Sequence, residues 1–431
     1  MTQRLDVKAA DFAQKFESLL AGKRESDQDV HDIVAQIISD VRTDGDKALL
    51  GYTKKFDRLT AGDVTALSVG RAEMRTALEA LDSGLRDALT HAAARIRAFH
   101  EKQQPAAIQY RDDDGVMLGM RHTPVDAAGL YVPGGKAAYP SSVLMNAIPA
   151  AVAGVERRVM VVPAPDGEVN PLVLAAALIA DVSEVWRIGG AQAIAALAYG
   201  TETIGRVDKI VGPGNAYVAA AKRQVFGQVG IDSIAGPSEI LVVADKDNDP
   251  SWIAADLLSQ AEHDEAAQSI LITDNQQFAD DVAAAVDAML PQLARADIAG
   301  QSWRDNGAII VLASMDQMPE IANRIAAEHL ELALEDADYW AGKIRHAGAM
   351  FLGRYTPEAI GDYVAGPNHV LPTARTARFS SGLGVADFMK RTTMVSCDVA
   401  GFNAIAPSGI ALANAEGLGA HALSMRIRMN R

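Results

Sequence analysis

The chain has 431 residues, more than one hydrophobic core normally organises, so we expect two or more domains. Its 40 Lys and Arg residues against 55 Asp and Glu residues give a net charge of -15, which disfavours nucleic acid and anionic membrane surfaces as partners. The single cysteine, Cys397, excludes an internal disulfide framework and a thiolate-rich zinc site, so any metal must be held by His, carboxylate or amide groups.

No segment of the sequence has the apolar character of a signal peptide or of a membrane-spanning helix. Residues 1–16 lack the apolar centre of a signal peptide, and the longest weakly polar run, residues 140–155, falls short of the ~20 apolar residues that a spanning helix needs. We therefore expect a cytoplasmic protein without a membrane partner.

Residues 1–105 place apolar side chains every three or four positions among charged ones, which predicts helices that form a scaffold without chemistry. From about Val125 the pattern changes to short β-rich runs, each followed by Gly or Pro and then an Ala-rich helix. This alternation is typical of parallel α/β units and predicts at least one wound sheet. The predicted strands are residues 159–162, 185–188, 209–211, 240–243, 269–272, 308–312 and 350–352.

Two Gly-rich turns follow predicted strands and open predicted helices: GGAQA at 189–193 and GPGNAY at 212–217. The free amides of such a helix end can receive the phosphates of a dinucleotide. Neither turn is a full GxGxxG motif, so a tight structural turn is an equally good interpretation of the spacing. Because ligands of open α/β sheets bind beyond the carboxyl ends of the strands, we expect function just after the predicted strands.

Two segments carry polar residues suited to a metal. Gln260 and His263 lie three positions apart on a predicted helix and hence on one face. Residues 361–373, GDYVAGPNHVLPT, place Asp362 and His369 among Gly and Pro, which predicts a rigid loop. Taken alone, Gln260 and His263 near a helix end are more often solvated or capping residues than metal ligands.

Further polar residues occur near the end of the chain and after a predicted helix over 318–327. In EGLGAHA, Glu416 and His421 are five positions apart, which is not one helical face and indicates two different partners. Glu328 and His329 can form an acid/base pair, although such a pair at a helix end is often a surface feature. The spacing permits, without requiring, a mixed nitrogen and oxygen set suited to zinc from Gln260, His263, Asp362 and His421.

From about Ser380 the chain is rich in Gly, and we expect irregular structure before a last helix over 416–429. Cys397 lies there in a β-rich run without a nearby base. This context favours a buried structural thiol over a nucleophile.

An ordered series of sequence strings resembles histidinol dehydrogenase. The resemblance runs from residue 131 to residue 421, and many of the strings lie in segments without regular periodicity, where core packing does not explain them. The strings are YVPGG (131–135), YPSSVLMN (139–146), GGAQA (189–193), VDKIVGPGN (207–215), AGPSE (235–239), SQAEHD (259–264), AEHLEL (327–332), GDYVAGPNHVLPT (361–373) and EGLGAHA (416–422).

The resemblance implies a zinc-dependent, NAD-linked dehydrogenase with one zinc ion per subunit. It implies the oxidation of L-histidinol to L-histidine through L-histidinal in two hydride transfers, the final steps of histidine biosynthesis. It also implies a homodimer in which the C-terminal tail crosses to the partner, so that His421 serves the neighbouring site.

The resemblance implies roles for individual residues. Glu328 and His329 match the family's proton acceptors, His329 for the alcohol proton and Glu328 for the water that adds to the aldehyde. The implied zinc ligands are Gln260, His263, Asp362 and His421. The implied NAD contacts are Tyr131, Gln192 and Asn215. The implied substrate contacts are Ser238, Gln260, His263, His329, Asp362, His369, Glu416 and His421.

Pattern and resemblance together predict an α/β fold with two wound parallel-sheet domains of an incomplete Rossmann-like kind, extended by helices at both ends. We expect an arm over residues 1–25 and an NAD-binding domain over 131–239. A larger domain over 26–130 and 240–380 would carry the zinc and acid/base residues, and the tail over 381–431 would reach the dimer partner.

Three alternatives remain at this point. A relative on the same scaffold could oxidise another primary alcohol, such as a sulfopropanediol, to an acid with the same machinery. An aldehyde dehydrogenase would need Cys397 as its nucleophile, and a metal-binding scaffold would hold zinc without reducing NAD.

Overall fold

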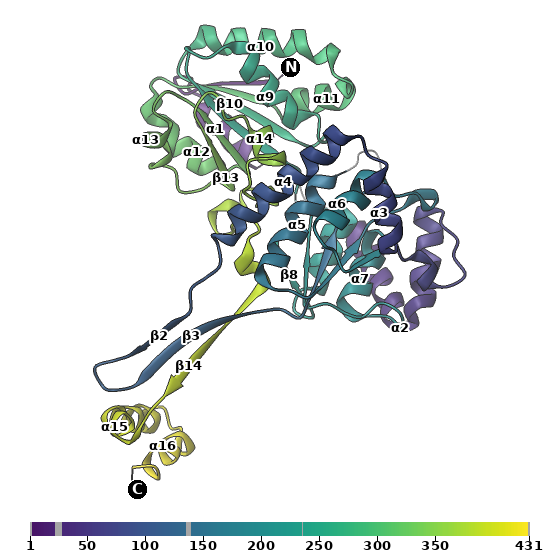
Figure 1. The fold of residues 1–431 in the computed structure, drawn as a ribbon. Helices are drawn as coiled ribbons and strands as arrows, with labels where there is room; N and C mark the ends of the chain where they lie inside the picture. Colours follow the sequence, from purple (N-terminus) through teal and green to yellow (C-terminus); the bar gives the residue numbers. More distant parts are fainter. Residues whose placement is uncertain (1, 22–27, 135–138, 235, 430–431) are drawn as a thin grey trace.

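The structure, a computed structural model, describes residues 2–21, 28–134, 139–234 and 236–429. Two parallel sheets, each covered by helices, form the body of the molecule, and a long arm leaves that body (Figure 1). Gly135 of the YVPGG string and Ala235 of the AGPSE string lie outside the described residues. Across the described part of the chain, no helix combines the length and apolarity needed to cross a membrane.

The first sheet has the strand order β6-β5-β4-β7-β8, and all its neighbours are parallel. Helices on both faces exclude water from it, and every residue of β4 is buried. Its strands are β4 (Ala127–Tyr131), β5 (Arg157–Val161), β6 (Glu184–Trp186), β7 (Lys209–Val211) and β8 (Gly230–Ile231). Its connecting helices are α5 (Pro140–Ala153), α6 (Pro171–Ile179), α7 (Gly190–Tyr199) and α8 (Ala216–Val225).

The second sheet has the order β1-β11-β10-β9-β12-β13 and is also parallel. Apart from edge strand β1, it repeats the winding of the first sheet, a repeat that the sequence does not show to the eye. Its strands are β1 (Gln3–Asp6), β9 (Glu239–Ala244), β10 (Gln268–Thr273), β11 (Ala308–Val311), β12 (His329–Ala333) and β13 (Ala349–Leu352). Its helices are α1 (Phe12–Leu20), α9 (Pro250–Ala261), α10 (Gln276–Met289), α11 (Ala296–Asn306), α12 (Met318–Ile325), α13 (Ala337–Ala341) and α14 (Glu358–Tyr363).

The predicted α/β fold with wound parallel sheets is confirmed, and each of the seven predicted strands matches an observed one. Two core strands, β4 and β12, were not predicted from the sequence. β12 begins with the sequence His-Leu-Glu, whose polar residues hide a strand that is buried along its whole length.

The predicted helices of the N-terminal region exist as α2 (Gln28–Asp57), α3 (Arg71–Glu79) and α4 (Ser83–Glu101). All three pack on the first sheet's helices: α2 on α7 and α8, α3 on α6, and α4 on α5. Residues 26–130 were expected to join residues 240–380, which carry most of the second sheet. These helices pack on the first sheet instead, because their apolar faces enter the two cores of that sheet.

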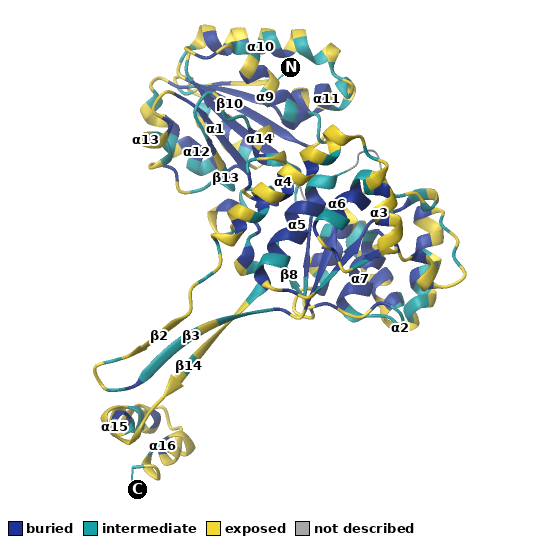
Figure 2. Cartoon of the chain, in the orientation of Figure 1, coloured by how far each residue is buried: buried dark blue, intermediate teal, exposed yellow. Residues whose placement is uncertain are grey.

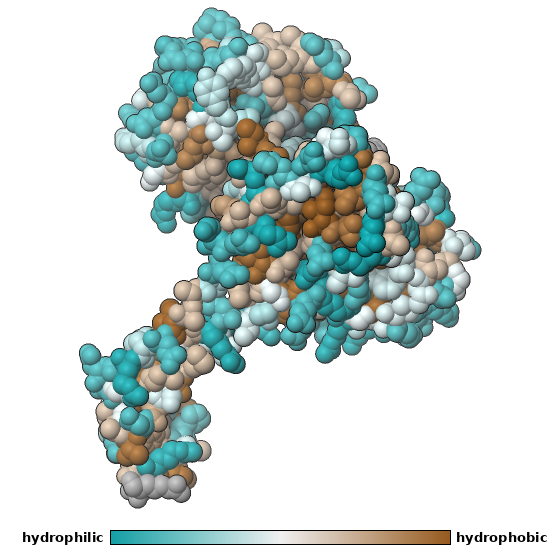
Figure 3. All heavy atoms as spheres, viewed as in Figure 1, coloured by the Kyte–Doolittle hydropathy of each residue, from teal (hydrophilic) through white to brown (hydrophobic). Residues whose placement is uncertain are grey.

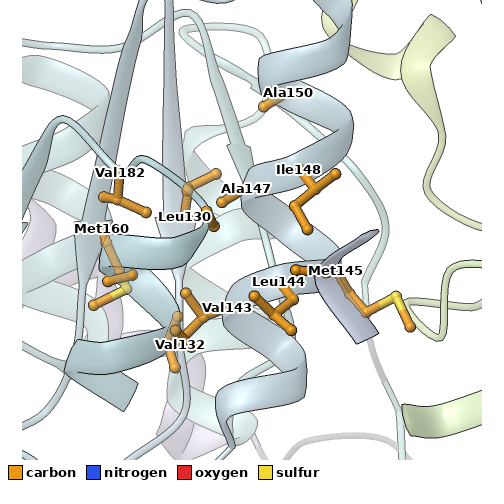
Figure 4. Packing of buried hydrophobic residues seen from close by; sticks show 14 of the residues in the cluster. Leu130, Val132, Val143, Leu144, Met145, Ala147, Ile148, Ala150, Met160 and Val182 are labelled. Atoms are coloured by element: carbon orange, nitrogen blue, oxygen red, sulfur yellow. The ribbon is translucent and has the colours of Figure 1, made fainter. Parts of the chain in front are cut away.

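Strand β4 is the centre of that packing. Leu130 and Val132 extend toward the apolar side chains of α5, including Val143 and Leu144, and these side chains interlock between the strand and the helix (Figure 4). A buried side chain of this size contributes roughly 1.5–3 kcal/mol through the apolar surface that it removes from water. The end of β4, where Tyr131 lies, is therefore held rigidly.

The arm consists of the antiparallel strands β2 (Ile108–Arg111), β3 (Met117–Pro124) and β14 (Met389–Ser396), followed by α15 (Val399–Ala415) and α16 (Gly419–Arg426). Most of its surface is exposed (Figure 2). The expectation of irregular structure from Ser380 onward is wrong for β14 and α15, because Gly and Pro407 within α15 obscure its helical pattern. The expected buried Cys397 is exposed.

Candidate functional site

The acid/base residues lie where two neighbouring strands of the second sheet begin. His329 is the first residue of β12 and Glu239 the first residue of β9, and the two strands pair in parallel. These are the amino ends of the strands, whereas function was expected just after the strands. Glu328 immediately precedes β12 and His329 is its first residue, so both belong to the entry of the strand.

The ring of His329 is fixed in one tautomer. Its Nδ1 lies 2.9 Å from the carbonyl oxygen of Glu239, and because a carbonyl can only accept, Nδ1 carries the proton and donates. In the neutral ring, Nε2 is then an unprotonated base. This atom is buried and makes no hydrogen bond within the described chain, while Glu358 Oε1 lies 3.7 Å from it. His329 is thus prepared to accept a proton from a bound molecule.

Glu328 is held by the same residue of β9. Its Oε2 accepts a hydrogen bond of 2.9 Å from the Glu239 N–H, and the side chain is almost fully buried. Burial raises the pKa of Glu328 to about 8, and the neighbouring His329 opposes this rise. A carboxyl group with that pKa exchanges its proton near neutral pH, as a general acid or base must.

A group that could hold a metal ion lies next to this pair. One ligand atom each of His329, Glu358 and Asp362 lies within 4.8 Å of the others. Glu358 and Asp362 are four residues apart on α14, so both point from one face of that helix. Asp362 therefore lies on a short helix, and the prediction of a loop there is wrong.

Gln260 borders this group from α9. Its side chain is fully buried, and neither Oε1 nor Nε2 has a hydrogen-bond partner among the described residues. The hydroxyl of the preceding Ser259 donates to Glu358 Oε2 at 3.3 Å and ties α9 to α14. A buried amide without partners costs on the order of 1–3 kcal/mol, so the site fits a ligand or ion that the amide oxygen would bind.

Two more imidazoles face Asp362. His263 follows α9 in a turn closed by its own N–H to Gln260 O, and His369 Nδ1 lies 3.7 Å from Asp362 Oδ1. Burial lowers the pKa of both rings, and the charge of Asp362 opposes this shift. Neutral imidazole is the form that coordinates metal ions, so burial prepares both rings for that role.

The segment that follows Asp362 also contacts the first sheet's helices. Arg95 of α4 donates to the carbonyl oxygens of Val364 and Ala365, and Asn368 Nδ2 donates to Met145 O of α5 at 2.6 Å. The cluster therefore lies between the two sheets, where binding sites commonly form. Ser238, which precedes β9, is half-buried at the same end of the second sheet.

Glu416 and His421 are not brought to this cluster. Glu416 directly follows α15 and His421 lies in α16, both exposed, at the far end of the arm (Figures 1 and 2). One chain thus gathers three of the four residues expected to bind zinc.

A second candidate site occupies the carboxyl edge of the first sheet. The hydroxyl of Tyr131, at the end of β4, accepts from Gly190 N at 3.1 Å, and burial raises the pKa of Tyr131 to about 12. Gln192 of α7 is buried, and its Oε1 has no partner within the described residues. Asn215 caps α8 and is exposed. The two predicted Gly-rich turns indeed open α7 and α8 here.

The turn before α8 depends on Gly212 and on a buried ion pair. Gly212 has a φ of 108°, and a Cβ there would lie 2.1 Å from the Tyr131 carbonyl oxygen, so only Gly fits. Lys222 Nζ donates to Gly212 O at 3.0 Å, and Asp232 Oδ2 accepts from Gly212 N at 2.8 Å. Lys222 and Asp232 also contact each other, and both are buried. The pair fixes both hydrogen-bonding groups of Gly212.

The roles of Glu239, Glu358, Lys222 and Asp232 were not predicted from the sequence. Glu358 had a usable signal, its spacing of four residues from Asp362. The other three give none, because they act through partners that only the fold brings near.

Comparisons with known proteins agree with this architecture. The family model described as histidinol dehydrogenase matches residues 20–429. Histidinol dehydrogenase of Rhodospirillum rubrum is 65% identical over 432 residues, covering 100% of this chain and 99% of the relative. That of Ruegeria pomeroyi is 60% identical over 431 residues, with 100% and 99% coverage.

A solved structure adds the three-dimensional match. The crystal structure of histidinol dehydrogenase from Elizabethkingia anophelis has a TM-score of 0.94 and 36% sequence identity, covering 100% of this chain and 98% of that one. The chain belongs to the histidinol dehydrogenase family.

The buried ion pair gives a prediction about the Gly212 turn. Lys222→Met should lower the free energy of unfolding by about 3–5 kcal/mol, because it leaves Asp232 buried and unpaired. The double variant Lys222→Met/Asp232→Asn should lose less free energy of unfolding than the two single variants lose together. Urea unfolding measures both effects, with Arg223→Met on the exposed neighbour as control, expected to cost under about 1 kcal/mol. If Lys222→Met and Arg223→Met lowered the free energy of unfolding equally, the buried ion pair would not be stabilising the turn.

Proposed function

We propose that the chain oxidises L-histidinol to L-histidine through L-histidinal, with two molecules of NAD reduced in sequence. Its membership of the histidinol dehydrogenase family over nearly the whole chain supports this substrate. The single structural observation that carries the chemistry is the pair of Glu328 and His329, both held by the backbone of Glu239.

In the first oxidation, His329 Nε2 takes the proton of the alcohol oxygen while the carbon's hydride leaves to NAD. Because Nδ1 is fixed to the Glu239 carbonyl, the ring presents Nε2 in its basic form, and the charge gained on protonation faces Glu358 and Asp362. In the second oxidation, water adds to the aldehyde and gives a proton to the carboxylate of Glu328. The hydrated aldehyde then loses its hydride to a second NAD.

We propose Gln260, His263 and Asp362 as the zinc ligands that one chain supplies. The unpartnered amide of Gln260 and the two imidazoles whose pKa burial lowers, those of His263 and His369, fit such a centre. When bound, zinc would hold the substrate by its amine and imidazole nitrogens and so orient the reacting carbon. His369 and Ser238 would contact the substrate, and Glu358 shares the group around Asp362.

The carboxyl edge of the first sheet is the proposed NAD site, with Tyr131, Gln192 and Asn215 as contacts. The buried, unpartnered Oε1 of Gln192 and the Gly-rich turns before α7 and α8 support this assignment. The close packing at Gly212 lets the backbone come near a bound phosphate.

We propose a homodimer in which His421 completes the partner's zinc centre and Glu416 the partner's substrate site. The arm carries large apolar side chains that water reaches, among them Val395, Val399 and Leu412, each at least 65% exposed. Apolar atoms also lie open over α5 and α6 (Figure 3). Covering such surface is the usual reason for an obligate interface.

The function predicts a stoichiometry and a metal dependence. The zinc-loaded protein should form two NADH per L-histidinol, lose activity after chelation and regain it with zinc. Absorbance at the NADH band against a known amount of L-histidinol measures this, and a sulfopropanediol serves as the alternative substrate. One NADH per substrate, or turnover of the sulfonate alone, would overturn the proposal.

The raised pKa of Glu328 predicts a pH profile for the aldehyde step. Since the carboxylate is the active form and burial sets the pKa at about 8, oxidation of L-histidinal should rise by about tenfold per pH unit below that value and level off above it.

Glu328→Gln should lower the rate of the aldehyde step by on the order of a hundredfold or more and remove this rise. The matched control is Glu335→Gln, at an exposed residue shortly after β12. This variant should keep the wild-type rate of the aldehyde step and its rise with pH. An unchanged profile in Glu328→Gln would show that another group takes the proton.

The shared site predicts complementation between inactive chains. His421→Asn chains mixed equally with Gln260→Ala chains should regain about a quarter of wild-type activity, since half the dimers are mixed and each holds one intact site. As a control, a chain carrying both changes should inactivate wild-type chains in mixed dimers. Mixed dimers without recovered activity would refute the exchange of tails.

A further inference from the structure

The end of α2 carries a buried carboxylate without a protein partner. Asp57 is 6% exposed, and its Oδ2 has no hydrogen-bond partner within the described residues. Burial raises the pKa of Asp57 to about 6, and only the neighbouring Arg58 opposes this shift. A buried polar group left without a partner is costly, and such exceptions call for a physical reason.

Asp57 lies at the carboxyl edge of the first sheet. Arg58 donates from Nε and Nη2 to both carboxylate oxygens of Asp166, in the loop after β5, at 2.8 and 2.5 Å. A Cβ built at Gly167 in the same loop would lie 3.1 Å from Leu59 Cδ1, so the chain after Asp57 packs on that loop. The charge of Asp57 also raises the pKa of Tyr131, at the end of β4, which places the carboxylate near that ring.

The place of Asp57 corresponds to a known requirement of wound sheets. In dinucleotide sites of this kind, a carboxylate at the end of the second strand accepts hydrogen bonds from a ribose hydroxyl. Here the second strand of the unit is β5, and the acid that follows it, Asp166, is paired with Arg58. Asp57, by contrast, keeps its buried Oδ2 free of donors from the described residues.

We infer that Asp57 accepts a hydrogen bond from the adenosine ribose of NAD and thereby selects NAD over its 2′-phosphorylated form. This inference rests on the proposed function of the first sheet as the NAD site. A ribose hydroxyl would supply the missing donor, whereas a 2′-phosphate would bring a second negative charge to a carboxylate that has little water around it. The binding residue thus comes from the N-terminal helices, which the sequence analysis treated as scaffold.

The inference is tested by isothermal titration calorimetry, in which the zinc-loaded full-length protein is titrated with NAD or with NADP. Asp57→Ala should raise the Kd for NAD by about tenfold or more, as expected for the loss of a hydrogen bond to a charged group. Asp57→Asn should raise the Kd for NAD by a smaller factor, and it should lower the ratio of the Kd for NADP to the Kd for NAD. The KM for L-histidinol should not change in either variant.

Thermal unfolding separates this role from a structural one. Without nucleotide, Asp57→Asn should keep or raise Tm, because it removes an unpaired buried charge. The matched control is Asp44→Asn, an exposed acid on the same helix, which should bind both nucleotides as wild type does.

Two results would overturn the inference: wild-type affinity for NAD in Asp57→Ala, or equal weakening for NAD and NADP together with a lower Tm. Failure of the wild-type protein itself to bind NAD would instead overturn the proposed function on which the inference depends.

Discussion

The backbone of Glu239 is the point on which the candidate active site depends. Its N–H fixes Glu328 and its carbonyl fixes His329, so one residue of β9 orients both groups of the proposed proton chemistry. Its side chain also accepts from Ala374 N at 2.9 Å, beyond the segment that carries His369. Because the positions of these atoms are set by the pairing of β9 with β12, the geometry is as rigid as the sheet.

Both candidate sites contain buried polar atoms that the described protein leaves without partners. Gln260 and His329 Nε2 lie at the cluster between the sheets, and Gln192 and Asp57 at the edge of the first sheet. Each such atom makes the ligand-free protein less stable than an apolar residue would. Bound substrate, metal or nucleotide would supply the missing partners. These positions therefore lower the stability of the ligand-free protein and favour binding.

The two sheets share their winding but present candidate binding groups at opposite edges. The first sheet presents Gly-rich turns at its carboxyl edge, where helix amides are free, while the second presents side chains from the turns that enter its strands. The arm carries Glu416 and His421 away from both. In the proposed homodimer, the arm of the second copy brings those residues to the cluster between the sheets.

The sequence by itself determined the local features of this protein. Short β-rich runs and Gly-rich turns predicted seven strands and the openings of α7 and α8, and the ordered sequence strings predicted the family. These features are readable because burial and turn geometry act over a few residues. The helix of Asp362, strand β12 and helix α15 were missed, since polar residues, Gly and Pro obscure their periodicity.

Only the tertiary structure decided which residues meet. Glu239 and His329 are 90 positions apart, and the pairing that joins them depends on strand order rather than on local pattern. The same holds for Arg58, which meets Asp166 at the carboxyl edge of the first sheet, and for Lys222, which meets Asp232 next to Gly212. Long-range contacts of this kind leave no periodic trace in the chain, because each partner's side chain is compatible with many other surroundings.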